Sequence, residues 1–134
     1  MNIQTISWVF AVVFLAMGIL GFVPGITTAD GMLFGMFQTS AMNNIVYIVT
    51  GLAALWAALS NPENSRGLFK VLGVFYALVA VIGLIQGPTV LGILTANAAL
   101  HFFHVIVALV GLWAGFGTSR TYPEADLATD VRRR

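Results

Sequence analysis

The chain lacks cysteine altogether and is poor in charge. Its 134 residues contain no Cys, and Asp, Glu, Lys and Arg together make up only 8%. Without cysteine the chain can form no disulfide, no thiolate metal site and no iron–sulfur site. A net charge of +1 offers no basic surface of the kind that nucleic acid requires, so we expect no nucleic-acid partner. At this length the chain holds one domain at most.

What the chain has in abundance is apolar side chains, which make up 59% of its residues. In soluble domains charged residues usually supply about 25% of the composition. A soluble protein this small could not bury so much hydrocarbon, because its surface is large relative to its volume. The composition therefore predicts an all-α integral membrane protein with the lipid bilayer as its solvent.

Four segments are long and apolar enough to span a bilayer, whose core needs roughly 20 apolar residues in a helix. They are residues 6–23, 42–59, 68–85 and 96–116. The first three are followed by turn signals built on Pro24, Pro62 and Pro88. Lys70 is the one charge within a span, close enough to its end to snorkel. The first segment has no positive region before it and no cleavage site after it, so we interpret it as a retained helix.

The distribution of positive charge predicts the orientation. Arg66 and Lys70 flank the second loop and Arg120 follows the fourth span, whereas the other two loops carry no Lys or Arg. The positive-inside bias then places both termini in the cytoplasm. Residues 1–116 form the transmembrane domain. Residues 117–134 form a polar cytoplasmic tail of mixed charge, which we expect to be disordered.

The first external loop, residues 27–40, is long and oily. Thr27 and Asp30 stand in it at a spacing similar to that of a capping box. This pattern predicts a short interfacial or re-entrant helix over residues 31–37. An irregular loop packed on the helix ends is the alternative.

The chain also matches itself. An offset of 57 places residues 33–58 over residues 90–115, with Trp56 on Trp113, and an offset of 62 places the first span over the third. This similarity predicts two tandem helix hairpins, repeat 1 at about residues 6–59 and repeat 2 at about residues 68–116. Each copy crosses the membrane twice, so the repeats would be parallel, with a pseudo-two-fold axis along the membrane normal.

Both histidines of the chain lie on one face of the fourth span. That face carries polar side chains at its outer end and small side chains at its inner end, and the second span has a matching face. We therefore expect the second and fourth helices to face each other near the pseudo-axis. The predicted intramembrane polar cluster comprises Asn44, Tyr47, Asn97, His101 and His104. The glycines predicted to serve helix packing are Gly21, Gly25, Gly51, Gly83, Gly87, Gly111 and Gly115.

These residues resemble a known family, the bacterial four-helix membrane proteins called domain of unknown function 4383. In that family the second helix opens with His-Asn-x-x-His, where this chain has Asn43, Asn44 and Tyr47. The fourth opens with Asn-x-x-Asp-Asn-x-x-His, of which Asn97 and His104 match, while Leu100 and His101 replace Asp and Asn. The resemblance implies a four-helix fold in a bacterial plasma membrane and implies no activity.

Three interpretations of the polar cluster stay open, and each implies a different function. A hydrogen-bonded clamp between hairpins fits a non-catalytic structural or accessory subunit, or assembly factor, that associates with other membrane subunits or with itself. A haem or quinone site at His101 and His104 would make a redox protein. A proton or solute path would make a small oligomeric transporter.

We expect no enzyme, because the sequence holds no paired carboxylates and no nucleophile placed beside a base. Neither a metal site nor a cofactor is required by the sequence, since His101, His104 and Asn97 lack the further ligand that zinc needs.

Overall fold

A computed structural model of the chain describes residues 2–117, which form four long helices. They are α1 (Ile3–Leu20), α2 (Ala41–Leu59), α3 (Pro62–Gln86) and α4 (Ala98–Leu112), which continues as a π-helical segment, Trp113–Gly117. Each, with α4 taken through Gly117, is long and apolar enough to cross a membrane. The predicted multi-pass, four-helix membrane architecture is therefore confirmed. The tail from residue 118 onward lies outside the described residues.

Side chains before each helix explain where the helices begin. Asn2, Ser40, Asn61 and Asn97 accept a hydrogen bond from a backbone N–H of the first turn, which satisfies one of its free donors. Asn61 is followed directly by Pro62, and proline is favoured at the first helical position. The proline that ends the second span therefore also begins α3, which starts earlier than the hydrophobic pattern predicts.

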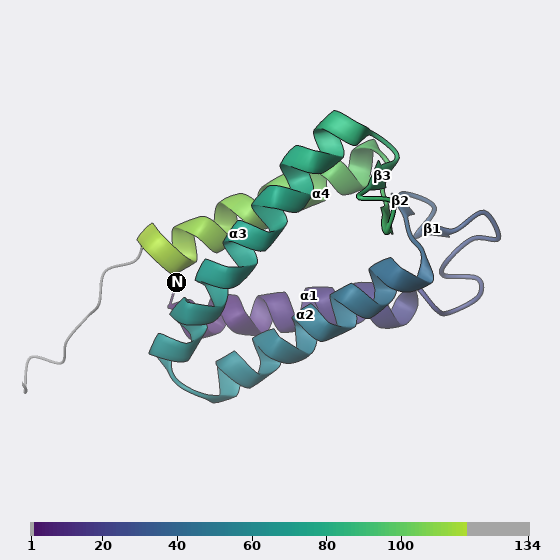
Figure 1. Ribbon diagram of the computed structural model, residues 1–134. Helices are drawn as coiled ribbons and strands as arrows, with labels where there is room; N and C mark the ends of the chain where they lie inside the picture. The colour runs from purple at the N-terminus through teal and green to yellow at the C-terminus, as the bar shows by residue number, and fades with distance from the viewer. Residues whose placement is uncertain (1, 118–134) are drawn as a thin grey trace, which may run out of the picture.

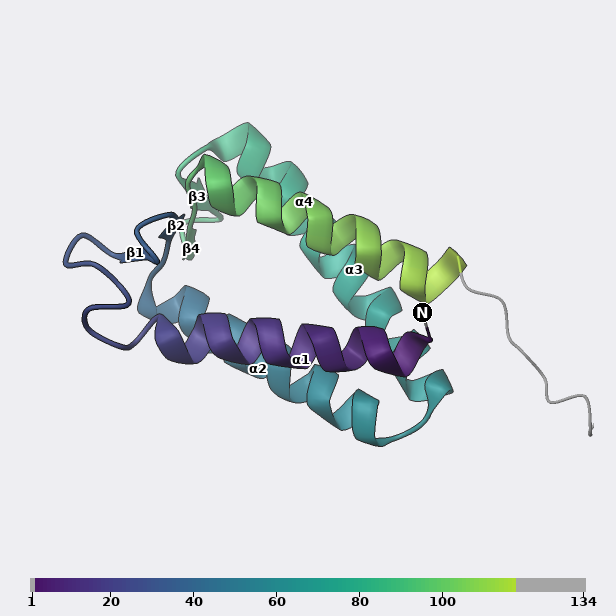
Figure 2. The ribbon, with the colours of Figure 1, turned by 180° about the vertical axis from the view of Figure 1, so that it is seen from behind.

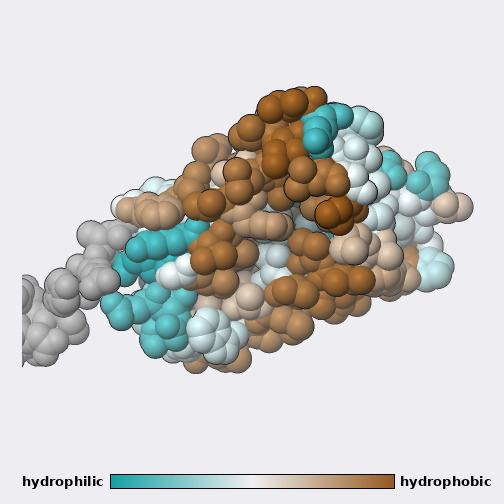
Figure 3. Space-filling view, in the orientation of Figure 1, coloured by the Kyte–Doolittle hydropathy of each residue, from teal (hydrophilic) through white to brown (hydrophobic). Residues whose placement is uncertain are grey.

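The helices pair along the chain, and the α1/α2 and α3/α4 pairs form two layers that diverge toward the short strands (Figures 1 and 2). The N-terminus and the end of α4 lie together at the opposite end. Hydrophobic residues cover the helices between ends that carry hydrophilic ones (Figure 3). The exposed helix surface is thus suited to lipid.

Small residues let the two helices of each pair approach closely. A Cβ on Gly51 of α2 would lie 2.7 Å from the side chain of Leu15 in α1, and one on Gly111 of α4 would lie 2.9 Å from Gly73 in α3. Gly115 meets the backbone of Lys70 in the same way. These three glycines therefore pack each helix against its own hairpin partner and not α2 against α4.

The external loop contains a β-hairpin, so the predicted helix over residues 31–37 is wrong. Strands β1 (Met32–Leu33) and β2 (Phe37–Gln38) pair antiparallel, with Leu33 opposite Phe37. Phe34 and Gly35 turn the chain between them at φ values of 55° and 68°, which a right-handed helix does not allow. Leu33 is only 1% exposed, so the hairpin also buries apolar surface.

The second external loop contains a hairpin of the same form. Strands β3 (Thr89–Val90) and β4 (Leu94–Thr95) pair with Val90 opposite Leu94, and the turn passes through Leu91 and Gly92 at φ values of 53° and 69°. Each half of the chain is thus a helix, a β-hairpin and a second helix.

Two of the glycines predicted to pack helices do something else. Gly25 and Gly87 lie beyond the ends of α1 and α3 with φ values of 93° and 82°, and a Cβ on either would have no neighbour within 4 Å. Within the chain they let the backbone turn, and their packing between protomers stays a prediction. Gly21 and Gly83 do lie in close contacts, against the side chains of Asn44 and His101.

Candidate functional site: a polar cluster between the hairpins

One hydrogen bond joins α2 to α4 in the middle of the bundle. The Tyr47 hydroxyl lies 3.0 Å from Nε2 of His104, and the two side chains are 3% and 1% exposed. The rings of Phe14 and Phe103 pack on this pair, with Phe14 5.7 Å from Tyr47 and Phe103 6.0 Å from His104, centroid to centroid. The predicted meeting of these residues is therefore present in the structure, inside an aromatic cage.

A second bond, which the sequence interpretation missed, joins α2 to α3. Thr50 donates to the carbonyl oxygen of Val46 at 2.8 Å, so the Tyr76 hydroxyl, 2.9 Å away, donates to Thr50. Thr50 lies one turn beyond Tyr47 on the same face of α2, which is the signal that could have identified it.

Asn43 makes two hydrogen bonds between the two halves, and it too was missed. Its amide nitrogen donates to the carbonyl oxygen of Thr95 at 2.6 Å, and its amide oxygen accepts from the backbone N–H of the same residue at 3.1 Å. Asn43 is 1% exposed. It therefore satisfies both backbone groups of a residue in β4, as a neighbouring strand would.

The other predicted cluster residues lie apart from this centre. The Asn44 side chain accepts from the Thr39 hydroxyl at 2.5 Å. Asn97 caps α4 and donates to the carbonyl oxygen of Met36 at 2.8 Å. Nε2 of His101 lies 2.7 Å from the carbonyl oxygen of Gly87, to which it donates. The five residues therefore do not form one site.

A further link joins α1 to α3 toward the other end of the bundle. Ser7 donates to the hydroxyl of Ser65 at 2.9 Å, and Ser65 donates to the carbonyl oxygen of Ala57 at 3.1 Å. Both serines have 0% exposure. The two hairpins are thus joined by polar contacts from one end of the bundle to the other.

Some polar atoms of the site keep free bonding capacity. Nδ1 of His101, Nδ1 of His104 and Oγ1 of Thr95 are buried without a hydrogen-bond partner. Among residues 2–117 no group of three or more His, Cys, Asp or Glu side chains could hold a metal ion.

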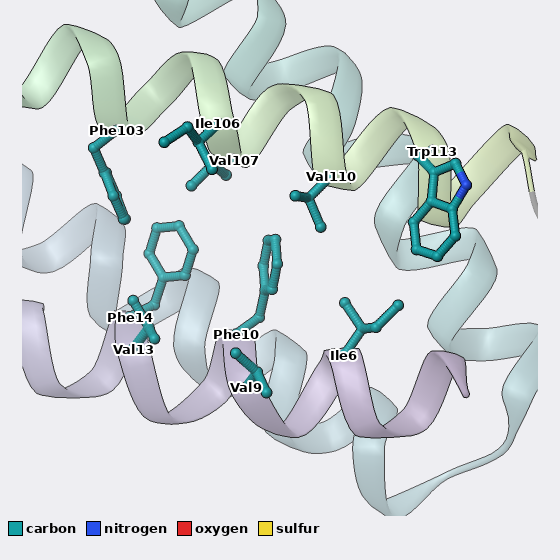
Figure 4. Close-up of a pocket in the computed structure, with 10 residues that line it drawn as sticks. All are labelled: Ile6, Val9, Phe10, Val13, Phe14, Phe103, Ile106, Val107, Val110 and Trp113. Carbon is teal, nitrogen blue, oxygen red and sulfur yellow. The ribbon is translucent and has the colours of Figure 1, made fainter. Parts of the chain in front are cut away.

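A groove of about 430 Å³ lies between α1 and α4 and shares Phe14 and Phe103 with the aromatic cage around Tyr47 and His104 (Figure 4). Its walls are wholly apolar. They are formed by Ile6, Val9, Phe10, Val13 and Phe14 of α1 with Phe103, Ile106, Val107, Val110 and Trp113 of the last helix.

Residues 4–117 match the family described as Domain of unknown function (DUF4383). The chain belongs to this family. The resemblance drawn from the sequence is thereby confirmed, and the match spans the whole helical bundle. No curated protein and no solved structure matches the chain significantly.

This chain departs from the second-helix and fourth-helix patterns of the family at residues that make interior contacts. Asn43 and Tyr47 stand where that pattern has histidines, and these are the residues of α2 that bond to β4 and to α4. Leu100 replaces the aspartate of the fourth-helix pattern and is 0% exposed, within the apolar core. The departures thus lie at contacts in the protein interior.

Proposed function

We propose that this protein is a non-catalytic integral membrane protein of the bacterial plasma membrane that acts by association, as a structural or accessory subunit of a membrane complex or as an assembly factor. The observation that carries this proposal is that the interior polar groups bond to other parts of the same chain. Tyr47, Asn43 and Tyr76 each bond to a residue in the other half of the chain. Because these side chains hold the two halves together, they fix the shape of the bundle. They thereby fix the shape of its lipid-facing surface too.

A tandem duplication forms part of the proposal. It is supported by the matching strands and turns of the two halves and by the N-caps of α2 and α4, each separated by 57 residues. Tyr47 and His104 are also 57 residues apart and touch each other. Two equivalent residues related by a two-fold axis contact each other where they approach that axis, so this pair would lie at the pseudo-axis.

The proposed orientation has both termini in the cytoplasm. It is supported by the basic residues Arg66 and Lys70, which lie toward the end of the bundle opposite the β-hairpins, because positive charge favours the cytoplasmic side. Trp8, Trp56 and Trp113 lie toward the same end and are 44%, 58% and 53% exposed, which marks that end as a membrane interface on either side.

Because the chain has no cysteine, single introduced thiols can test this orientation. In spheroplasts an impermeant maleimide should label Ala29→Cys, whereas Gly67→Cys should react after permeabilisation only. The reverse pattern would overturn the proposed orientation.

The experiment that tests the function is purification from the native membrane in mild detergent, with an absorption spectrum of the oxidised and reduced sample. We expect a colourless protein accompanied by partner subunits in fixed ratio. Partner chains should be lost when residues on the lipid-facing surface are changed and retained in His101→Leu. A protein that purifies alone and in monomeric form would contradict the proposal.

One observation favours a second candidate, a haem- or quinone-associated redox protein. Nδ1 of both histidines is buried and without a partner, so each could accept a bond from a ligand or bind a metal. A Soret band that disappears in His104→Ala would establish this candidate in place of the accessory role. The transporter stays a prediction from the sequence alone.

A further inference from the structure

The two helix pairs meet along two seams, one between α2 and α3 and the other between α4 and α1. The contacts that close these seams differ. The seam between α2 and α3 is covered by the short connection at Asn61 and bridged by the bond between Thr50 and Tyr76. In the seam between α4 and α1, the aligned positions hold Val107 and Phe14, both of which line the apolar groove. The α2/α3 seam is thus bridged by a hydrogen bond. The α4/α1 seam is an open groove lined by apolar side chains.

The groove has the length of one membrane leaflet. From Ile6 to Phe14 helix α1 advances roughly 12 Å, and the hydrocarbon of one leaflet is about 15 Å thick. At its deep end the rings of Phe14 and Phe103 close the groove, with centroids 5.7 Å apart. At the other end it reaches Trp113, close to the end of the helix (Figure 4). An acyl chain of the adjacent leaflet matches this length and this lining.

A positive charge lies beyond the Trp113 end of the groove. The Lys70 ammonium lies over the ring of Phe116, 5.5 Å from its centroid, and Phe116 follows Trp113 by one turn of the last helix. The indole nitrogen of Trp113 lies on the side of its ring nearer that helix end (Figure 4). An ammonium and an indole N–H at the level of the headgroups complement a negatively charged lipid.

We propose that the groove between α1 and α4 binds an anionic phospholipid of the leaflet next to Trp113, with one acyl chain between the helices and the phosphate beside Lys70. Under the orientation proposed above, this is the cytoplasmic leaflet. The site does not depend on the accessory role, because it is built from this chain alone. Its occupant is a lipid rather than a protein segment because the walls are wholly apolar over one leaflet and the charge lies at headgroup depth.

The test uses quenching of single tryptophans by lipids with brominated acyl chains. Trp8→Phe with Trp56→Phe leaves Trp113 as the reporter in the groove. Trp8→Phe with Trp113→Phe leaves Trp56, at the aligned position of α2, as the matched control. Each protein is placed in phosphatidylcholine vesicles containing a small fraction of brominated phosphatidylglycerol, or of brominated phosphatidylcholine.

We expect Trp113 to report a binding constant about fivefold higher for phosphatidylglycerol, the preference that one lysine near the headgroups supplies at about 1 kcal/mol. Trp56 should report no preference. Lys70→Gln should remove the preference at Trp113. Val110→Phe, which fills the groove, should remove it too, whereas Leu109→Phe on the exposed side of the same helix should retain it.

Equal constants at Trp113 and Trp56 would overturn the site. So would a Trp113 shielded from both brominated lipids, since a second copy of the chain or a partner helix would then occupy the groove. A preference that survives Lys70→Gln would refute the assignment of the headgroup. No partner chain enters these measurements, so their failure is distinguishable from failure of the accessory role.

Discussion

Replacing Tyr47 by Phe tests whether the polar centre holds the hairpins together. The change removes one hydroxyl, keeps the ring among Phe14 and Phe103, and takes away the bond to Nε2 of His104. Since Nδ1 of that histidine already lacks a partner, the imidazole would be left buried with no hydrogen bond at all.

The expected loss in the free energy of unfolding depends on the unpaired imidazole that the variant leaves in the interior. Hydrogen bonds between membrane helices are worth about 0.6 kcal/mol on average and at most about 1.7 kcal/mol. A buried polar group left unsatisfied costs about 1–3 kcal/mol. Because His104 is 1% exposed and cannot turn to water, the second effect dominates, and we expect Tyr47→Phe to lower the free energy of unfolding by about 1–3 kcal/mol.

The double variant Tyr47→Phe with His104→Leu should recover most of this loss, because replacing both partners by apolar groups leaves no orphaned atom. Tyr76→Phe is the matched control. It removes the same hydroxyl from a side chain of the same burial, but Thr50 keeps its bond to Val46, so the cost should stay near 0.5–1 kcal/mol, the approximate worth of one ordinary bond.

Reversible unfolding in mixed detergent micelles, followed by circular dichroism, measures all four proteins. Equal stability of Tyr47→Phe and the wild type would refute the clamp, and so would a double variant that is no more stable than Tyr47→Phe.

Three more outcomes follow from other contacts. Gly73→Ala places a Cβ 2.6 Å from the backbone of α4 and should destabilise by about 1–3 kcal/mol in the same unfolding assay, whereas Gly67→Ala on the same helix meets open space and should be neutral or stabilising. Asn43→Leu frees both backbone groups of Thr95 and should speed hydrogen exchange in β4, while Asn43→Asp, which keeps the acceptor, should do so less. Phe34→Gly relieves a left-handed residue that is 57% exposed and should raise stability by up to about 1 kcal/mol in thermal unfolding; a loss would show that its ring packs on a partner.

Composition and hydrophobic runs were enough to predict the membrane class and the four spanning helices. A helix in lipid satisfies its own backbone bonds, so its existence depends on local sequence and hardly on its neighbours. The turn prolines marked the ends of the spans because proline disfavours a helical residue before it, although Pro62 also begins α3. The stripe on α4 led to Tyr47 and His104 because residues that share a helix face can be read from spacing.

The sequence by itself thus determined which segments are helices, which of their faces are polar, and which family the chain belongs to. The tertiary structure decided which partner each polar group takes: Asn43 reaches the strand β4, 52 residues away, and His101 turns back to Gly87. It also decided that the external loops are β-hairpins and that a groove lies open between the first helix and the last. The groove and the Asn43 contact depend on how the two helix hairpins meet, and no local pattern of residues encodes that distance or angle.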